Sequence, residues 1–132
     1  MANPERRIVR ALRELARERP LEVRVSGNCM VPFARSGDRV AVAPARFYWP
    51  GYVIAFKARG GGLLLHRLIG YLPCSRKLEL LTRGDSCASC DGAITADHLI
   101  GRAAIPVPLS HRLRALVRFT AHLLTRIAAR FR

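Results

Sequence analysis

Cys29 and His66 are a candidate nucleophile and general base in this sequence. A thiol is readily activated, because a neighbouring imidazolium stabilises the thiolate. His66 would take the thiol proton and return it to a leaving amine, while a carboxylate such as Asp91 would fix the imidazole tautomer. The backbone N–H of Cys29, within a glycine-containing turn, would donate to the oxyanion. This chemistry is acyl transfer, although four cysteines, four histidines and nine carboxylates allow many such trios by chance.

Short apolar runs separated by glycine and proline fill the middle of the chain and would have to position these groups. Residues 21–25 alternate apolar with charged side chains, as a half-buried strand does. Further runs follow at 40–42, 53–56, 63–69, 78–81 and 94–102. Many short runs punctuated in this way predict a mainly β fold, a curled β barrel or sheet over residues 21–105.

An amphipathic helix is predicted at the N-terminal end, within residues 1–20. Apolar side chains recur at helical spacing over residues 5–18, and charged side chains occupy the other face. Pro20 ends this helix.

A second, basic amphipathic helix is predicted within residues 106–132, after Pro106 and Pro108. Its apolar stripe consists of Leu109, Leu113, Leu116, Val117, Thr120, Leu123, Leu124, Ile127 and Phe131. Six arginines and no carboxylate lie between residues 109 and 132. Such a helix either packs its stripe on the domain or lies on an anionic membrane surface.

Three sequence boxes surround the candidate nucleophile, base and carboxylate. The first is Ser26-Gly27-Asn28-Cys29-Met30-Val31-Pro32, followed by Gly37-Asp38-Arg39-Val40. The second is Leu65-His66-Arg67-Leu68-Ile69-Gly70, and the third is Thr82-Arg83-Gly84-Asp85, with Asp91 six residues further on. In order and spacing they resemble the boxes of the signal peptidase/LexA superfamily. The histidine of the second box makes them most similar to the Ser-His signal peptidases of archaea and the endoplasmic reticulum.

The resemblance covers residues 21–104 and implies a signal peptidase/LexA-like curled β barrel that hydrolyses peptide bonds. It implies Cys29 as nucleophile, His66 as general base and Asp91 as the third catalytic residue, with Asp85 as the alternative carboxylate. The residues next to the nucleophile that it implies in oxyanion or substrate binding are Asn28, Met30 and Pro32. The implied substrate is an extended peptide or protein precursor that lies along a strand edge, with small side chains before the scissile bond.

The sequence departs from the signal peptidase pattern in three respects. Cys29 replaces the nucleophilic serine, and Tyr52 stands where a second Gly-Asp turn would have its aspartate. The third departure is the missing transmembrane anchor, because no run approaches the ~18–20 apolar residues of a membrane span. The first residues also lack the apolar segment of a secretory signal. The expected location is therefore the cytoplasm, including the periphery of the inner membrane face.

Each candidate residue also has a purely structural interpretation. Cys29 would be a small buried hydrophobe, and His66 would be a hydrogen-bonded core residue. Asp91 would cap a turn with Gly92, and Asp85 would brace the turn at Gly84. The boxes favour the catalytic roles of Cys29 and His66 over these alternatives, whereas for Asp91 the catalytic and structural interpretations stay equally open.

The other cysteines carry weaker signals. Cys87 and Cys90 form a single C-x-x-C pair that Cys74 and His98 could complete as zinc ligands, but one such pair is weak evidence. A redox-sensitive couple is another interpretation, and the favoured one is two incidental loop thiols. We therefore expect no metal and no cofactor.

The net charge of +14 indicates anionic partners rather than a fold. An anionic membrane ranks first for the C-terminal helix, and nucleic acid ranks lower because no recognised binding motif is present. The alternative to an enzyme is a catalytically weak or inactive relative that binds peptides or membrane as an accessory module. An autocleaving repressor is disfavoured, because the sequence has no DNA-binding segment and no Ala-Gly or Cys-Gly bond.

Overall fold

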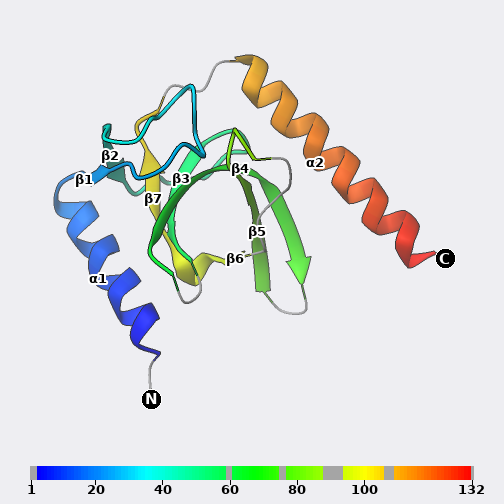
Figure 1. Cartoon of the computed structure of the whole chain (residues 1–132). Coiled ribbons are helices and arrows are strands. Elements are labelled where there is room, and N and C mark those ends of the chain that lie inside the picture. Colours follow the sequence, from blue (N-terminus) through cyan, green and yellow to red (C-terminus); the bar gives the residue numbers. More distant parts are fainter. Residues whose placement is uncertain (1–2, 59–60, 75–76, 88–93, 106–108, 132) are drawn as a thin grey trace.

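The computed structural model describes residues 3–58, 61–74, 77–87, 94–105 and 109–131, which form a mainly β protein with a helix at each end (Figure 1). Its helices are α1 (Pro4–Glu18) and α2 (Leu109–Arg130), with a 3-10 turn η1 (Ala96–His98). Its strands are β1 (Leu21–Arg24), β2 (Arg39–Ala43), β3 (Val53–Lys57), β4 (Leu63–Cys74), β5 (Lys77–Arg83), β6 (Ile94–Thr95) and β7 (Leu99–Ala103). The prediction of a mainly β fold between two amphipathic helices is confirmed.

The seven strands form one antiparallel sheet in the order β1-β2-β7-β3-β4-β5-β6. The sheet curls into a half-barrel (Figure 1). Residues of β1 and of the start of β4 therefore line one cavity, although three strands separate them in the sheet. Because the sheet curls, its central strand β3 is buried on both faces. Val53 and Ala55 enter one apolar core with Val42 and Ile100. On the other face, Ile54 and Phe56 enter a second core, whose other buried members are Leu68, Leu80, Ile94 and Leu99.

Helix α1 covers the side of the half-barrel formed by β2 and β7. The Asn3 side chain caps its first turn by accepting from the Glu5 N–H, at 2.9 Å. Val9 and Ala16 are buried against the sheet. Arg13 reaches past them and donates to the carbonyl oxygens of Ala96, at 2.9 Å, and Leu99, at 3.1 Å from Nε.

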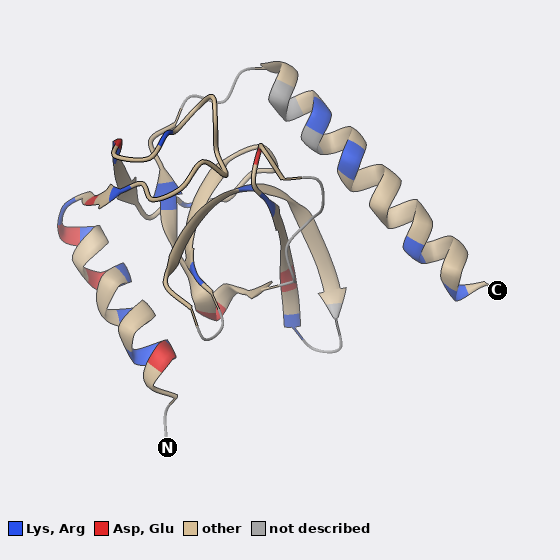
Figure 2. Cartoon of the chain, viewed as in Figure 1, with Lys and Arg blue, Asp and Glu red and all other residues tan. Residues whose placement is uncertain are grey.

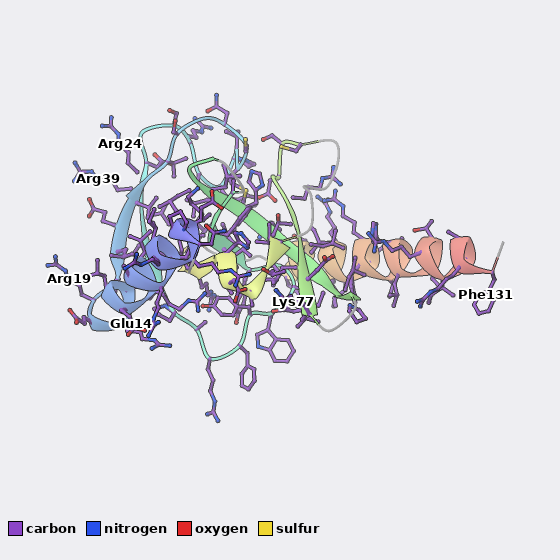
Figure 3. The ribbon with its side chains drawn as sticks, turned by 90° about the horizontal axis from the view of Figure 1, so that it is seen from below. Glu14, Arg19, Arg24, Arg39, Lys77 and Phe131 are labelled. Atoms are coloured by element: carbon purple, nitrogen blue, oxygen red, sulfur yellow. The ribbon has the colours of Figure 1, made fainter. Side chains whose placement is uncertain are left out.

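Helix α2 packs on the outside of the β4–β5 hairpin through Phe119 and Leu123, which contact a small cluster made of Ile69, Leu72 and Leu81. Phe119 lies outside the predicted stripe, most of which stays exposed. The helix extends away from the sheet, with Phe131 at its far end (Figure 3). Its described charged residues are all basic, whereas α1 carries both signs (Figure 2). Neither described helix is long and apolar enough to cross a bilayer.

Candidate active site

Cys29 lies in a loop of residues 25–38 that follows β1 and is here called the nucleophile loop, after the role predicted for Cys29. The loop is closed at its base, because the Val25 N–H donates to the Asp38 carbonyl, at 2.8 Å, and the Gly37 N–H donates to the Val25 carbonyl, at 2.9 Å. Gly27 and Gly37 have positive φ angles of 84° and 95°, a region that side chains with a Cβ rarely adopt. The loop folds back on itself and leaves the side chain of Cys29 exposed.

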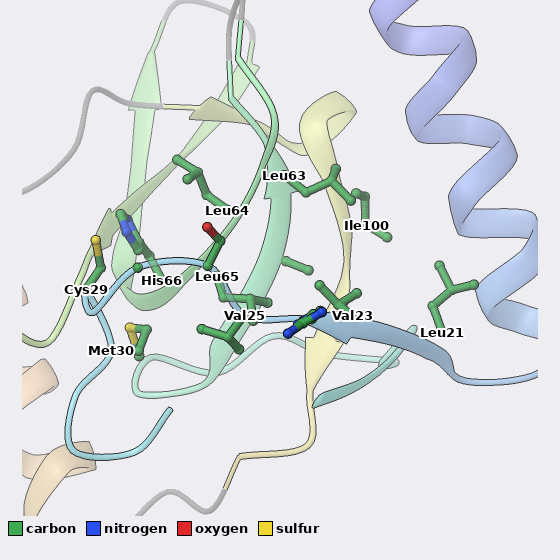
Figure 4. A pocket seen from close by; sticks show the side chains of 14 residues that line it. Leu21, Val23, Val25, Cys29, Met30, Leu63, Leu64, Leu65, His66 and Ile100 are labelled. Carbon is green, nitrogen blue, oxygen red and sulfur yellow. The ribbon is translucent and has the colours of Figure 1, made fainter. Parts of the chain in front are cut away.

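Cys29 and His66 line the same cavity, of about 90 Å³, between β1 and the first residues of β4. Figure 4 shows the sulfur and the imidazole at the same end of this cavity. Most of the other lining residues are apolar, namely Leu21, Val23, Val25, Met30, Ala55, Leu63, Leu64, Leu65 and Ile100. The structure therefore places the predicted nucleophile and base together at an apolar cavity.

His66 is held within the sheet. It is 5% exposed and pairs across the ladder with Ile54 of β3. Its ring meets the Phe56 ring edge-on, with 6.0 Å between centroids. Packing therefore limits the orientations of the imidazole, which a general base requires.

Arg67, the next residue of β4, joins three segments around the site. Its Nε and Nη2 donate to the two carboxylate oxygens of Asp85, at 2.7 and 2.6 Å. Its Nη1 donates to the Gly51 carbonyl, at 2.6 Å, and the guanidinium lies 5.1 Å from the ring centre of Phe33 in the nucleophile loop. Because the Arg67 and Asp85 side chains are only 3% and 9% exposed, this bidentate ion pair is buried.

The turn of residues 84–87 holds the nucleophile loop directly. The Ser86 N–H donates to the Cys29 carbonyl, at 2.9 Å, and the Ser86 hydroxyl contacts the carbonyl oxygens of Asn28 and Val31, at 2.9 and 3.2 Å. A Cβ on Gly84 would lie 3.0 Å from the Cys29 carbonyl oxygen. Glycine at this position therefore allows the turn to approach the backbone of Cys29.

The other predicted site residues have different surroundings. Asn28 is exposed and contributes its backbone carbonyl to the Ser86 contact. Met30 is 2% exposed and belongs to both the core and the cavity wall. Pro32 is exposed, follows a cis peptide bond and does not line the cavity. Asp85 binds Arg67 with both oxygens, and Asp91 lies outside the described residues.

The zinc interpretation concerns residues that the structure describes only in part. Cys90 and the side chain of Cys74 lie outside the described residues. His98 is near the Thr95 hydroxyl, with 3.2 Å between Nδ1 and Oγ1. Within the described part of the chain, no three His, Cys, Asp or Glu side chains come together as metal ligands would.

Comparison with protein-family models, curated proteins and solved structures finds no match to this chain.

Sequence reasoning assigned no part in the site to Arg67 or Ser86. The bidentate pairing of Arg67 with Asp85 has no local signal, because the two residues are 18 positions apart. Ser86 follows the third box directly, and its place in a Gly-Asp-Ser turn was the only hint of a hydrogen-bonding role.

Proposed function

We propose that this protein is a signal peptidase-like endopeptidase that cleaves a peptide or protein precursor through Cys29 and His66. The observation that carries the proposal is that both side chains line one apolar cavity between two strands. The sequence boxes at residues 26–32 and 65–70 support the same roles.

The strand edges beside the cavity suit an extended substrate. Among the described strands, β1 pairs only with β2, and residues 63–66 of β4 pair only with β3, because the β4–β5 ladder begins at Arg67. Each strand thus presents backbone N–H and C=O groups toward the cavity side. A peptide in extended conformation can add to such an edge, with the apolar wall receiving alternate side chains. A volume of about 90 Å³ favours a small apolar side chain before the scissile bond.

In the proposed mechanism, the sulfur of Cys29 attacks the scissile carbonyl carbon after His66 takes the thiol proton. The C–N bond breaks as His66 returns that proton to the leaving amine. A water molecule then gives a proton to His66 and attacks the thioester carbonyl carbon. The C–S bond breaks as His66 returns this proton to the sulfur, which releases the carboxylic acid product and restores the thiol. The contact between Ser86 and the Cys29 carbonyl fixes the peptide plane of the nucleophile throughout.

A peptide electrophile tests this proposal, and an alanine-containing peptide vinyl sulfone is suitable. Trypsin separates Cys29, on residues 25–35, from Cys74, on 68–76, and from the remaining cysteines, on 84–102. We expect the label to accumulate on residues 25–35, and we expect His66→Ala to slow labelling by about 10²–10⁴-fold. His98→Ala is the matched control and should label at the wild-type rate. Equal labelling of Cys29 and Cys74, or no effect of His66→Ala, would reject activated-thiol catalysis.

A second candidate function, reversible binding to an anionic membrane surface, is supported by helix α2. Apolar side chains beside its docked face remain largely exposed, including Val117, at 67%, and Leu124, at 65%. Exposed arginines flank them at positions 114, 118, 126 and 130. Each basic residue near an anionic leaflet contributes about 1 kcal/mol, so apolar burial and charge favour the same surface.

Vesicle sedimentation tests this second function. The full chain should sediment with vesicles that contain phosphatidylglycerol and stay in solution with pure phosphatidylcholine. Leu124→Gln should weaken sedimentation, whereas Leu78→Gln, at an exposed position of β5, is the matched control. Equal sedimentation of wild type and Leu124→Gln would reject insertion of the apolar face. Duplex DNA binding that Leu124→Gln leaves unchanged would assign the basic residues to nucleic acid instead.

A further inference from the structure

Cys29 and Cys87, which belong to different segments, meet over Gly84. Both are reduced in the structure, with Cys29 exposed and Cys87 partly exposed. A Cβ on Gly84 would lie 3.1 Å from the Cys29 Cβ and 2.8 Å from the Cys87 sulfur. The two cysteines therefore border the same small space, which is open because residue 84 has no side chain.

The backbone around both cysteines is fixed in this arrangement. The Ser86 N–H donates to the Cys29 carbonyl, at 2.9 Å, and the Cys87 N–H donates to the Gly84 carbonyl, at 3.0 Å. Arg83 Nε donates to the Cys87 carbonyl, at 2.7 Å. A disulfide requires the two Cβ atoms to lie about 3.5–4.5 Å apart. The Cys29 Cβ and the Cys87 sulfur both lie next to the position that a Cβ on Gly84 would occupy, so the two segments are already adjacent where the bond would form.

We propose that Cys87 is the resolving thiol for Cys29 and that a peroxide converts the pair into a disulfide. The Cys29 thiolate attacks one oxygen of hydrogen peroxide and forms a sulfenic acid, with hydroxide as the leaving group. The Cys87 sulfur then attacks the Cys29 sulfur, so that the S–S bond forms and the sulfenic oxygen leaves as water. A dithiol reductant reverses the bond by thiol–disulfide exchange.

The bond would switch off the proposed peptidase reversibly, because it removes the thiolate that attacks the substrate. This regulatory consequence rests on the proposed function, whereas formation of the bond does not. Rapid closure of the disulfide would also protect Cys29 from irreversible oxidation to sulfinic and sulfonic acids.

Peptide mapping of the oxidised full chain tests the proposal. After treatment with hydrogen peroxide and alkylation of the remaining thiols, trypsin should yield residues 25–35 cross-linked to residues 84–102. Dithiothreitol should abolish the cross-link and restore iodoacetamide labelling of Cys29. Cys90→Ser and Cys74→Ser should keep the cross-link, whereas Cys87→Ser should lose it and accumulate sulfinic and sulfonic acids on residues 25–35.

Two results would overturn the redox pair. One is a cross-link that persists in Cys87→Ser, which would assign the bond to Cys90, and the other is an oxidised wild type whose bond lies within residues 84–102 alone. Thermal melting of reduced Cys87→Ser, matched to wild type, shows that loss of the cross-link is not loss of the fold. If the cross-link forms but no peptide electrophile labels Cys29 faster than Cys74, the proposed peptidase fails and the redox pair stands.

Discussion

Arg67 is the residue on which the described contacts around the site converge. Its side chain is 3% exposed and contacts Asp85, Gly51 and Phe33, each from a different segment. A buried guanidinium keeps its charge, so its environment must supply an opposite charge and acceptors. Asp85 therefore has a structural role, because both of its carboxylate oxygens bind the buried guanidinium.

Asp85→Asn should lower the free energy of unfolding by about 3–5 kcal/mol, because it leaves the Arg67 charge buried without its counter-charge. Urea denaturation of the two proteins measures the difference. The matched control is Glu22→Gln in the Arg39–Glu22 pair, whose side chains are 73% and 64% exposed. That change should cost at most about 1 kcal/mol. An Asp85→Asn protein as stable as the control would show that the ion pair does not stabilise the fold.

Tyr71 provides a prediction about pH. Burial, with a smaller contribution from Tyr48, raises the pKa of Tyr71 above its ordinary value of 10.0, and its hydroxyl donates to the Tyr48 carbonyl. The folded state therefore favours the neutral phenol. The contribution of Tyr71 to the stability of the folded protein is fully present below pH 10 and is lost as the pH rises through the raised pKa. Tyr71→Phe should cost about 1 kcal/mol at neutral pH. Urea titrations should show that this difference shrinks in alkaline solution, and a difference that grows with pH would contradict the assignment.

At this scale the sequence predicted which side chains meet at the cavity better than it predicted which groups support them. Cys29 and His66 stood in boxes with their own spacing, and both line the cavity. The partner of Asp85 and the proximity of Cys87 to Cys29 depend on how β5 and its following turn pack on the nucleophile loop. Residue type and spacing carry no information about that packing.

Among the elements, the β4–β5 hairpin contributes both to the cavity and to the packing of α2. Its first residues line the cavity, and its second half forms the platform for α2. The strand was predicted over residues 63–69 but continues to Cys74, because a bulge between Leu68 and Gly70 shifts the register and the ladder with β5 carries on beyond it. Pairing with β5 extends the strand even through Pro73, which local preference disfavours.

Gly70→Ala should displace α2. A Cβ at this position would lie 2.1–2.6 Å from three atoms of the Phe119 ring, so the ring and its helix would have to move. We expect a loss of about 1–3 kcal/mol in the free energy of unfolding and faster tryptic cleavage at the α2 arginines.

Gly62→Ala is the matched control for this experiment, because a Cβ there meets nothing within 4 Å. It should leave both the unfolding free energy and the cleavage rate near wild type. If Gly70→Ala behaves like Gly62→Ala in limited proteolysis, the contact of Phe119 with β4 does not hold the helix.

The net positive charge of the whole molecule destabilises its compact folded state. Twenty-three basic residues face nine acidic ones, and the described ion pairs on the surface, such as Arg6–Asp97 and Arg17–Glu14, have side chains that are roughly half exposed or more. Such pairs contribute little, so repulsion among unpaired cations outweighs them. Salt should therefore stabilise this protein, although it weakens the surface pairs.

Raising sodium chloride from about 20 mM to about 300 mM should increase the free energy of unfolding by roughly 1 kcal/mol and the melting temperature by a few degrees. Differential scanning calorimetry measures the shift. A combined variant with Gln at positions 114, 118, 126 and 130 carries four fewer positive charges and should respond less. A melting temperature that falls with salt would mean that the surface ion pairs dominate.

The sequence predicted the class of the fold but not how far the sheet curls. Short β runs and two amphipathic stripes indicated a mainly β fold with a helix at each end. The extent of curling, which brings β1 opposite the start of β4, follows from twist and bulges summed over the sheet. The exposure of the α2 stripe was likewise left open, because a pattern does not show how much of a helix face its domain covers.

The hydrogen bonds between Ser86 and the nucleophile loop have a consequence for synthesis of the chain. The bonds of the Ser86 hydroxyl to Asn28 and Val31 connect residues 58 and 55 positions apart. Contacts between such distant positions form only after most of the intervening segment has collapsed. A nascent polypeptide therefore exposes Cys29 to the surrounding medium long before Ser86 has left the ribosome, and the site acquires its shape only when the second half of the molecule arrives.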